Sequence, residues 1–189
     1  KSVKAFQEAS KVMHEGVPMS WMAKWPGPHP VFVAKAKGAK FVDLDGNKYI
    51  DFCLGDTGSM TGHSPDATVK AIREQAGRGI TAMLPTKDAA FVSGELAKRF
   101  GLPLWQFTVS ATDANRHVIR YSRLITKKSK IIVIDRCYHG SVDETFATLD
   151  SSGKTVSREG NIGAPIDLDK TTRVVPFNDL DAMKNALQQ

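Results

Sequence analysis

The sequence has few cysteines and no long apolar run. Its 189 residues include two cysteines, Cys53 and Cys137, which are far apart and match no metal-ligand spacing. Two isolated thiols favour reduced cysteines in a cytoplasmic protein over a disulfide scaffold or a zinc site. No segment approaches the roughly 20 apolar residues that span a bilayer, and the first residues lack an apolar signal core. We therefore expect a cytoplasmic protein that binds no membrane.

Positive charge is present but is not concentrated. The formal net charge is +6, and the only short basic run is Lys127, Lys128 and Lys130. Nucleic-acid binding is not expected, because no arginine-aromatic interleaving and no zinc-finger spacing accompany these charges. A mildly basic surface instead favours small anionic ligands.

The first third of the sequence predicts small, mixed elements. A helical pattern covers residues 2–15, and three prolines make residues 21–30 irregular. The stretch 31–52 predicts an antiparallel unit, because Asp45-Gly46 is a strong tight-turn signal between alternating segments. Further helices are expected after Pro65 and from Thr86 to Phe100.

From Trp105 onward the pattern is that of an α/β protein. The run Ile131–Ile134 is continuously apolar, as in strands that are buried on both faces of a parallel sheet. The expected elements are strand 106–109, helix 111–125, strand 131–134, exposed loop 151–172, strand 174–177 and a final helix capped by Asn178 or Asp179. The fold class is therefore α/β, with a mostly parallel sheet after a small N-terminal helix-plus-hairpin segment.

Residues 107–115 combine a strand end, small residues and a helix start. Ser110 is a candidate helix cap, with Asp113 at the capping-box position. The first helical turn leaves N–H groups unpaired, and these groups attract a phosphate. Ser110 and Thr112 can add hydroxyl hydrogen bonds. A plain helix cap without a ligand is the alternative interpretation.

A second motif, Cys137-Tyr138-His139-Gly140, follows the apolar strand. Ligands of open α/β sheets bind at the carboxyl ends of the strands. Tyr138 can stack on a planar group, and Gly140 permits close approach. For His139 and the distant His63, a hydrogen-bonded structural role is favoured over a metal pair, so no metal site is expected.

Together these motifs resemble the class III aminotransferases, a family of fold type I pyridoxal-phosphate enzymes. The family includes glutamate-1-semialdehyde aminomutase and β- and ω-amino-acid aminotransferases. The matching stretches occur in the family's order: Asp43–Asp51, Gly62–Pro65, Ser110–Asn115, Tyr138–Gly140 and Phe177–Asp179.

The resemblance implies a binding site for pyridoxal 5'-phosphate. By this resemblance the N–H groups of Ala111 and Thr112, helped by the hydroxyl of Ser110 or Thr112, hold the phosphate, and Tyr138 stacks on the ring. The implied cofactor-binding residues are Ser110, Ala111, Thr112, Tyr138, His139 and Gly140, and the implied substrate loop contains Gly55, Asp56 and Thr57. Two positions depart from the family: Ala111 replaces glycine, so the turn must avoid positive φ or carry strain, and Asp113 replaces glutamate.

The implied activity is transfer of an amino group between an amino acid or amine and a keto acid or aldehyde. An intramolecular aminomutase is the near alternative. In the family the lysine that forms the Schiff base lies beyond the stretch that matches this chain, so no catalytic residue is expected here and the chain alone should be inactive. Residues 1–62 are expected to belong to the small domain, and residues 63–189 to an incomplete large domain. A homodimer is implied, to which the arm around Met83–Thr86 contributes.

Two other functions remain open at this stage. Asp56-Thr57-Gly58 resembles an aspartic-protease signature, but those enzymes pair two such aspartates, and here helices are predicted around the motif. The phosphate-binding turn also suits a non-enzymatic binding module, since no catalytic lysine is recognised in this chain.

Overall fold

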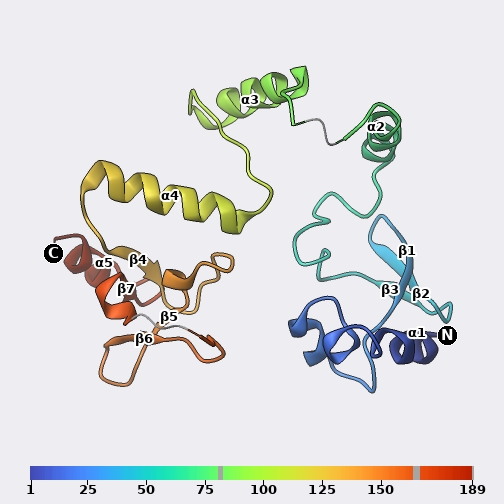
Figure 1. Ribbon diagram of the computed structural model, residues 1–189, viewed down its shortest axis with the longest axis horizontal. Helices are drawn as coiled ribbons and strands as arrows, with labels where there is room; N and C mark the ends of the chain where they lie inside the picture. The colour runs from blue at the N-terminus through green and yellow to red at the C-terminus, as the bar shows by residue number, and fades with distance from the viewer. Residues whose placement is uncertain (81–82, 164–166, 189) are drawn as a thin grey trace. The chain divides into compact units, whose positions relative to one another are not determined.

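The computed structural model describes residues 1–80, 83–163 and 167–188. The chain forms two compact units, Lys1–Pro85 and Thr86–Gln189 (Figure 1). The predicted boundary after residue 62 refers to the domains of a complete enzyme and stays a prediction. No helix within the described ranges is long and apolar enough to cross a membrane.

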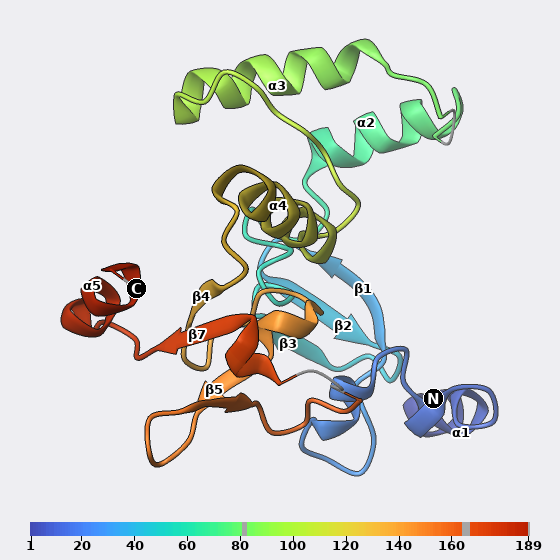
Figure 2. The same cartoon turned by 60° about the vertical axis from the view of Figure 1, so that its left-hand side comes forward.

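The first unit is built around a three-stranded antiparallel sheet. Its elements are α1 (Ser2–Ala9), the 3₁₀ helices η1 (His14–Gly16) and η2 (Ser20–Lys24), strands β1 (Val33–Lys37), β2 (Lys40–Asp43) and β3 (Lys48–Ile50), and helix α2 (Asp66–Ala76). The strand order is β1-β2-β3, as Figure 2 shows. The predicted antiparallel unit is therefore confirmed. The predicted helix 2–15 is too long, because Ser10 ends α1 and its hydroxyl donates to the carbonyl of Phe6.

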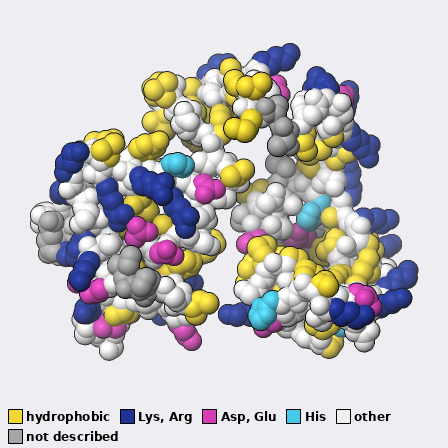
Figure 3. All heavy atoms as spheres, viewed as in Figure 1, with side chains coloured by type: hydrophobic (Ala, Val, Ile, Leu, Met, Phe, Trp, Pro, Cys, Tyr) yellow, Lys and Arg dark blue, Asp and Glu magenta, His cyan; other side chains and the backbone are white. Residues whose placement is uncertain are grey.

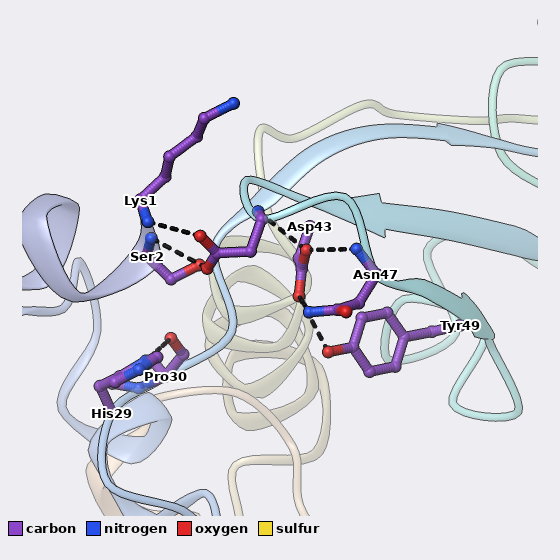
Figure 4. A network of polar contacts seen from close by, with 8 residues as sticks. Lys1, Ser2, His29, Pro30, Asp43, Asn47 and Tyr49 are labelled. Atoms are coloured by element: carbon purple, nitrogen blue, oxygen red, sulfur yellow. Dashed lines mark hydrogen bonds and ion pairs between the residues drawn. The ribbon is translucent and has the colours of Figure 1, made fainter.

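A buried carboxylate fixes the turn between β2 and β3. Asp43 accepts hydrogen bonds from the N–H of Asp45 (2.9 Å), from the N–H and side-chain amide of Asn47 (2.8 and 2.9 Å) and from the Tyr49 hydroxyl (2.9 Å) (Figure 4). These bonds, first of all that from the Asn47 side chain, hold the pKa of Asp43 below its usual range. Asp45 in turn accepts from the N–H of Ser2 (3.1 Å). The turn thereby holds the start of α1.

The second unit contains helices around short strands. Its elements are α3 (Lys87–Phe100), α4 (Ala111–Thr126), β4 (Ile131–Ile134), η3 (Asp143–Thr145), β5 (Ala147–Leu149), β6 (Thr155–Ser157), η4 (Leu168–Lys170), β7 (Thr172–Val175) and α5 (Leu180–Gln188). Strands β4 and β7 pair in parallel, with Val133 beside Val174. Strands β5 and β6 form an antiparallel pair. The buried core consists of Val133, Ala147, Leu168 and Val174.

Three expectations for this unit are wrong. Residues 106–109 form no strand: no neighbouring strand pairs with them in the described residues, and the Val109 side chain is 99% exposed. The stretch 151–172 is not simply a loop, because β6 and η4 lie within it. In β4 only Val133 is buried, since β7 is its one paired neighbour among the described strands.

An ion pair links α4 to η3. Arg123 donates to Glu144 (2.9 Å) through one guanidinium nitrogen and to the Ser129 carbonyl (2.8 Å) through another. Burial raises the pKa of Glu144, but the hydrogen bond and charge of Arg123 outweigh it, so the pKa lies below its usual range.

We predict that Glu144→Gln lowers the free energy of unfolding by about 1–3 kcal/mol at neutral pH, because it leaves the Arg123 charge without its partner. A carboxylate with a lowered pKa stabilises the folded state above its unfolded pKa, and this contribution disappears as pH falls through the folded value. The difference from the wild type should therefore shrink below about pH 4. Urea denaturation at several pH values measures it, with exposed Glu159→Gln as the control, expected within about 0.5 kcal/mol. Equal effects of the two variants would contradict the prediction.

Candidate functional site

The first turn of α4 presents donors that the chain does not use. Ser110 is the helix cap: its hydroxyl accepts from the N–H of Asp113 (3.2 Å) and donates to the Asp113 carboxylate (2.9 Å). Ala111 begins the helix and is not among the described residues with positive φ, so glycine is not required there. Within the described chain, no acceptor is seen for the N–H groups of Ala111 and Thr112. These two donors point out of the positive end of the helix dipole.

The turn after β4 packs against this helix start. Gly140 has a φ of +79°, and a Cβ built on it would lie 2.4 Å from the Thr112 hydroxyl oxygen and 3.0 Å from the Thr112 nitrogen. The next residue, Ser141, donates its N–H to that hydroxyl oxygen (3.0 Å). Glycine is therefore required at residue 140 for both backbone conformation and space.

Two side chains of α4 reinforce this contact. Asn115 donates its amide to the carbonyl of His139 (2.8 Å), and Arg116 lies 3.4 Å from the carbonyl of Ser141. Our sequence analysis assigned no role to Asn115, Arg116 or Ser141. Two signals were available: Asn115 closes the stretch Ser110–Asn115 that matches the family, and it lies in the second helical turn, where its side chain cannot cap the helix.

Tyr138 and His139 follow the carboxyl end of β4. Tyr138 is 70% exposed, so its ring is available for stacking. His139 is half-buried, and its Nε2 atom is buried with no hydrogen-bond partner in the described part of the chain. The structure thus gathers Ser110, Ala111, Thr112, His139 and Gly140 at one place, with Tyr138 beside them.

This arrangement is suited to a phosphate group. Two backbone N–H groups lie at the positive end of the helix dipole. The Thr112 hydroxyl oxygen accepts from Ser141, and in the described chain no acceptor is seen for its proton. The Ser110 hydroxyl proton is engaged by Asp113. Of the two hydroxyls considered in the sequence, Thr112 is therefore the better phosphate donor.

The other predicted residues, Gly55, Asp56 and Thr57, belong to the first unit. The four residues Leu54–Thr57 all have positive φ, between 54° and 67°. Asp51 holds this loop by accepting the N–H groups of Cys53 (2.8 Å) and Gly55 (3.0 Å). Such a strained backbone persists only where its surroundings fix it, and it is common at functional sites.

His63 completes the support of this loop. Its Nε2 lies 2.7 Å from the Asp51 carboxylate and its Nδ1 lies 3.2 Å from the Ser59 hydroxyl. The hydrogen bond from His63 is the main reason that the pKa of Asp51 is lowered. The expected hydrogen-bonded role is confirmed for His63 but not for His139, whose buried Nε2 has no partner in the described chain.

Solved structures share this fold along nearly the whole chain. A glutamate-1-semialdehyde aminomutase from Pseudomonas aeruginosa PAO1 matches 99% of this chain and 41% of its own, with a TM-score of 0.94 and 48% identity. An omega-transaminase from Sphaerobacter thermophilus matches all of this chain and 44% of its own, with a TM-score of 0.87 and 27% identity. The predicted fold class, that of the fold type I pyridoxal-phosphate enzymes, is confirmed.

The sequence comparison narrows the class to a family. The aminotransferase class-III profile matches residues 21–187, so this chain belongs to the class III aminotransferase family. Glutamate-1-semialdehyde 2,1-aminomutases from Thermodesulfovibrio yellowstonii and Methanocaldococcus jannaschii are each 36% identical to it over its whole length. The chain spans 45% and 44% of these two relatives. None of the comparisons supports the aspartic-protease interpretation of Asp56.

Substitution of Gly140 tests the close contact between Gly140 and Thr112. Gly140→Ala should lower the free energy of unfolding by about 2–4 kcal/mol, because the new methyl group overlaps the backbone of Thr112 and the positive φ is strained. Gly153→Ala is the matched control: its φ is +82° and no atom lies within 4 Å of the added Cβ. It should cost only the backbone term, about 1 kcal/mol. Chemical denaturation of both variants measures the difference, and equal losses would rule out the close contact.

Proposed function

We propose that the protein carrying this chain binds pyridoxal 5'-phosphate and uses it to move an amino group. The observation that carries the proposal is the pair of N–H groups of Ala111 and Thr112, which have no acceptor in the described chain, with the Gly140 turn packed against them. Two solved relatives support the cofactor: an aminomutase from P. aeruginosa is described in complex with PMP, and a transaminase 30% identical to this chain is described with PLP bound.

The residues of this chain would bind and orient the cofactor. Ala111 and Thr112 would donate to the phosphate, and Tyr138 would lie against the ring, while Gly140 lets the turn after β4 pack against Thr112. When bound, the cofactor would supply an aldehyde that reacts with an amine and a conjugated ring that withdraws electrons from the bound amine. The Asp113 carboxylate engages Ser110, which keeps the helix start in its capped geometry.

The reacting lysine is expected outside this chain. Lys127, Lys128 and Lys130 connect α4 to the amino end of β4, whereas Tyr138 and His139 follow its carboxyl end. A ligand at the carboxyl end is therefore remote from these three side chains. We propose that the Schiff-base lysine lies in the remaining part of the protein and that this chain contributes the phosphate-binding part of the site.

Two reactions fit this proposal. Transfer of an amino group between an amine or amino acid and a separate keto acid or aldehyde is the general reaction of the family. An intramolecular shift is the second candidate, because the relatives at 36% identity and the structural neighbour at 48% identity are all named glutamate-1-semialdehyde aminomutases. Without an added keto acid or aldehyde acceptor, an aminomutase continues to convert its substrate, whereas a transaminase stops after its first half-reaction. Measuring product formation with and without an acceptor therefore distinguishes the two reactions.

A homodimer is part of the proposal. Exposed apolar side chains support it: Phe91 and Phe100 of α3 are open to solvent, and Figure 3 shows such side chains over this helix. Met83 and Leu84, in the arm predicted to reach a partner, are also exposed. A cytoplasmic location stays a prediction.

The central test is an absorbance spectrum of the full-length protein with pyridoxal phosphate. We expect an absorbance band of the lysine-bound cofactor. Reduction with borohydride should then attach the cofactor permanently to a lysine outside residues 1–189, which peptide mapping would identify. Protein saturated with cofactor but without this band would overturn the proposed activity and would favour a phosphate-binding module.

The role of Thr112 has its own test. Thr112→Val keeps the shape but removes the hydroxyl, so the affinity for pyridoxal phosphate should fall about tenfold, the value of one hydrogen bond to a charged group. Ser110→Ala in the same background should weaken binding further through the helix cap. Thr112→Ser should restore most of the loss. Equilibrium titration of the apo-protein measures these affinities, and unchanged binding by Thr112→Val would place the phosphate elsewhere.

A further inference from the structure

Three side chains of the first unit form a hydrogen-bonded chain that the proposed function does not use. The Asp51 carboxylate lies 2.7 Å from Nε2 of His63, and Nδ1 of the same ring lies 3.2 Å from the Ser59 hydroxyl oxygen. Within the described residues, no other serine or threonine hydroxyl is hydrogen-bonded to a histidine ring. A hydroxyl, an imidazole and a carboxylate linked in this order are the groups of a serine nucleophile, its base and the acid that positions the base.

The carboxylate decides which nitrogen of His63 is the base. The pKa of Asp51 is lowered, chiefly by the hydrogen bond from His63, so the carboxylate is ionised at neutral pH and can only accept. In a neutral ring Nε2 therefore carries the proton, and the lone pair is on Nδ1. Nδ1 faces Ser59 and accepts its hydroxyl hydrogen. This tautomer is the one that a base needs in order to remove the serine proton.

Little water reaches these hydrogen bonds. The side chains of Asp51 and His63 are only 9% and 20% exposed, and low exposure strengthens hydrogen bonds between polar groups. Ser59 is half-buried. The neighbouring residue in space, Gly55, has no side chain, and a Cβ built there would lie 2.9 Å from the Ser59 hydroxyl oxygen. Residue 55 therefore leaves that side of the hydroxyl uncovered.

The same loop contains a donor for the charge of an acyl-transfer reaction. Attack on a carbonyl carbon places negative charge on the carbonyl oxygen, and the N–H group of the residue after the nucleophile can stabilise it. Here that residue is Met60. In the described chain no acceptor is seen for its N–H group or for that of Thr61, whereas the N–H group of Ser59 donates to the Leu54 carbonyl (2.8 Å).

We propose that Ser59 is an activated nucleophile that hydrolyses small activated carboxylic esters. The Ser59 oxygen attacks the ester carbonyl while its proton moves to Nδ1 of His63, and the ester bond then breaks as the alcohol leaves with that proton. Water next attacks the acyl-serine, giving one proton to Nδ1, and the acid is released as Ser59 takes that proton back. Asp51 positions the ring and stays ionised throughout. The reaction uses only side chains of the first unit, so it goes beyond the proposed function.

Ester turnover tests the proposal in the full-length protein with its cofactor bound. p-Nitrophenyl acetate is supplied in large excess, and the release of p-nitrophenolate is followed over many equivalents of protein. Lysine side chains also take acetyl groups, but the amides are stable, so sustained release reports a nucleophile that turns over. Because positioned proton transfer contributes about 10²–10⁴-fold, Ser59→Ala should lower the sustained rate at least about tenfold.

A second serine of the same unit is the matched control. The hydroxyl of Ser64 donates to the carbonyl of Ala36 (3.1 Å) instead of to an imidazole. Ser64→Ala should therefore keep the rate of the wild type. Equal sustained rates for the wild type and Ser59→Ala would overturn the proposal.

A fluorophosphonate identifies the reacting residue. It attaches to an activated serine as the P–F bond breaks and fluoride leaves with the serine proton. Peptide mapping should find the phosphonyl group on Ser59 and none on Ser64. His63→Gln removes the base and should abolish this labelling. An unlabelled wild-type protein, or labelling of Ser59 that survives His63→Gln, would overturn the proposal and would leave these hydrogen bonds as supports of the loop.

The positioning role of Asp51 is tested with a pair of variants. Asp51→Asn should slow the labelling of Ser59, because an amide oxygen or nitrogen can face Nε2 and no longer fixes the proton there. Asp51→Glu keeps the carboxylate, so it should label faster than Asp51→Asn. Equal labelling rates for the wild type and Asp51→Asn would contradict this role.

Discussion

The close approach of Gly140 to the first turn of α4 is the contact on which the proposed phosphate site depends. Helix α4 has no buried residue, and a hollow of about 240 Å³, lined by Val118, Ile119 and Val133 among others, separates its inner face from β4. Polar contacts at its two ends therefore hold it, at Thr112 and Asn115 near the start and at Arg123 near the end. If the contacts of Thr112 and Asn115 are lost, the position of the Ala111 and Thr112 N–H groups relative to Tyr138 is no longer fixed.

Features that depend on neighbours in sequence were predictable. The Ser110 cap, the Asp45-Gly46 turn and the Asp179 cap, which accepts the N–H of Ala182 (2.8 Å), each join residues within four positions. Residues 106–109 illustrate the opposite case. Their β-propensity is real, but a strand exists only where another strand accepts its hydrogen bonds, and none does so in the described chain. Strand β6 was missed because its short segment lies in the polar stretch 151–172, whose composition is that of a loop, and β5 was missed because three residues are too few for a strand pattern.

The residues of the candidate site were predictable from the sequence, but the hydrogen bonds that each of them makes were not. The small residues at 110–112 and the glycine at 140 gave its place. Asp113 decides which hydroxyl is free to donate, because its carboxylate accepts the hydrogen bond from the Ser110 hydroxyl. The bond from Asn115 to His139 joins residues 24 positions apart, and no local pattern announces it. Long-range contacts of this kind decide the geometry, while the short motif decides only the chemistry.

Local backbone geometry decides where charge gathers in each unit. At the start of α4, the parallel N–H dipoles create a positive field, and Arg116 on the next helical turn adds a positive charge near Ser141. In the first unit, strand alternation sends four lysines to one face of the sheet, where Lys35, Lys37, Lys40 and Lys48 line a groove.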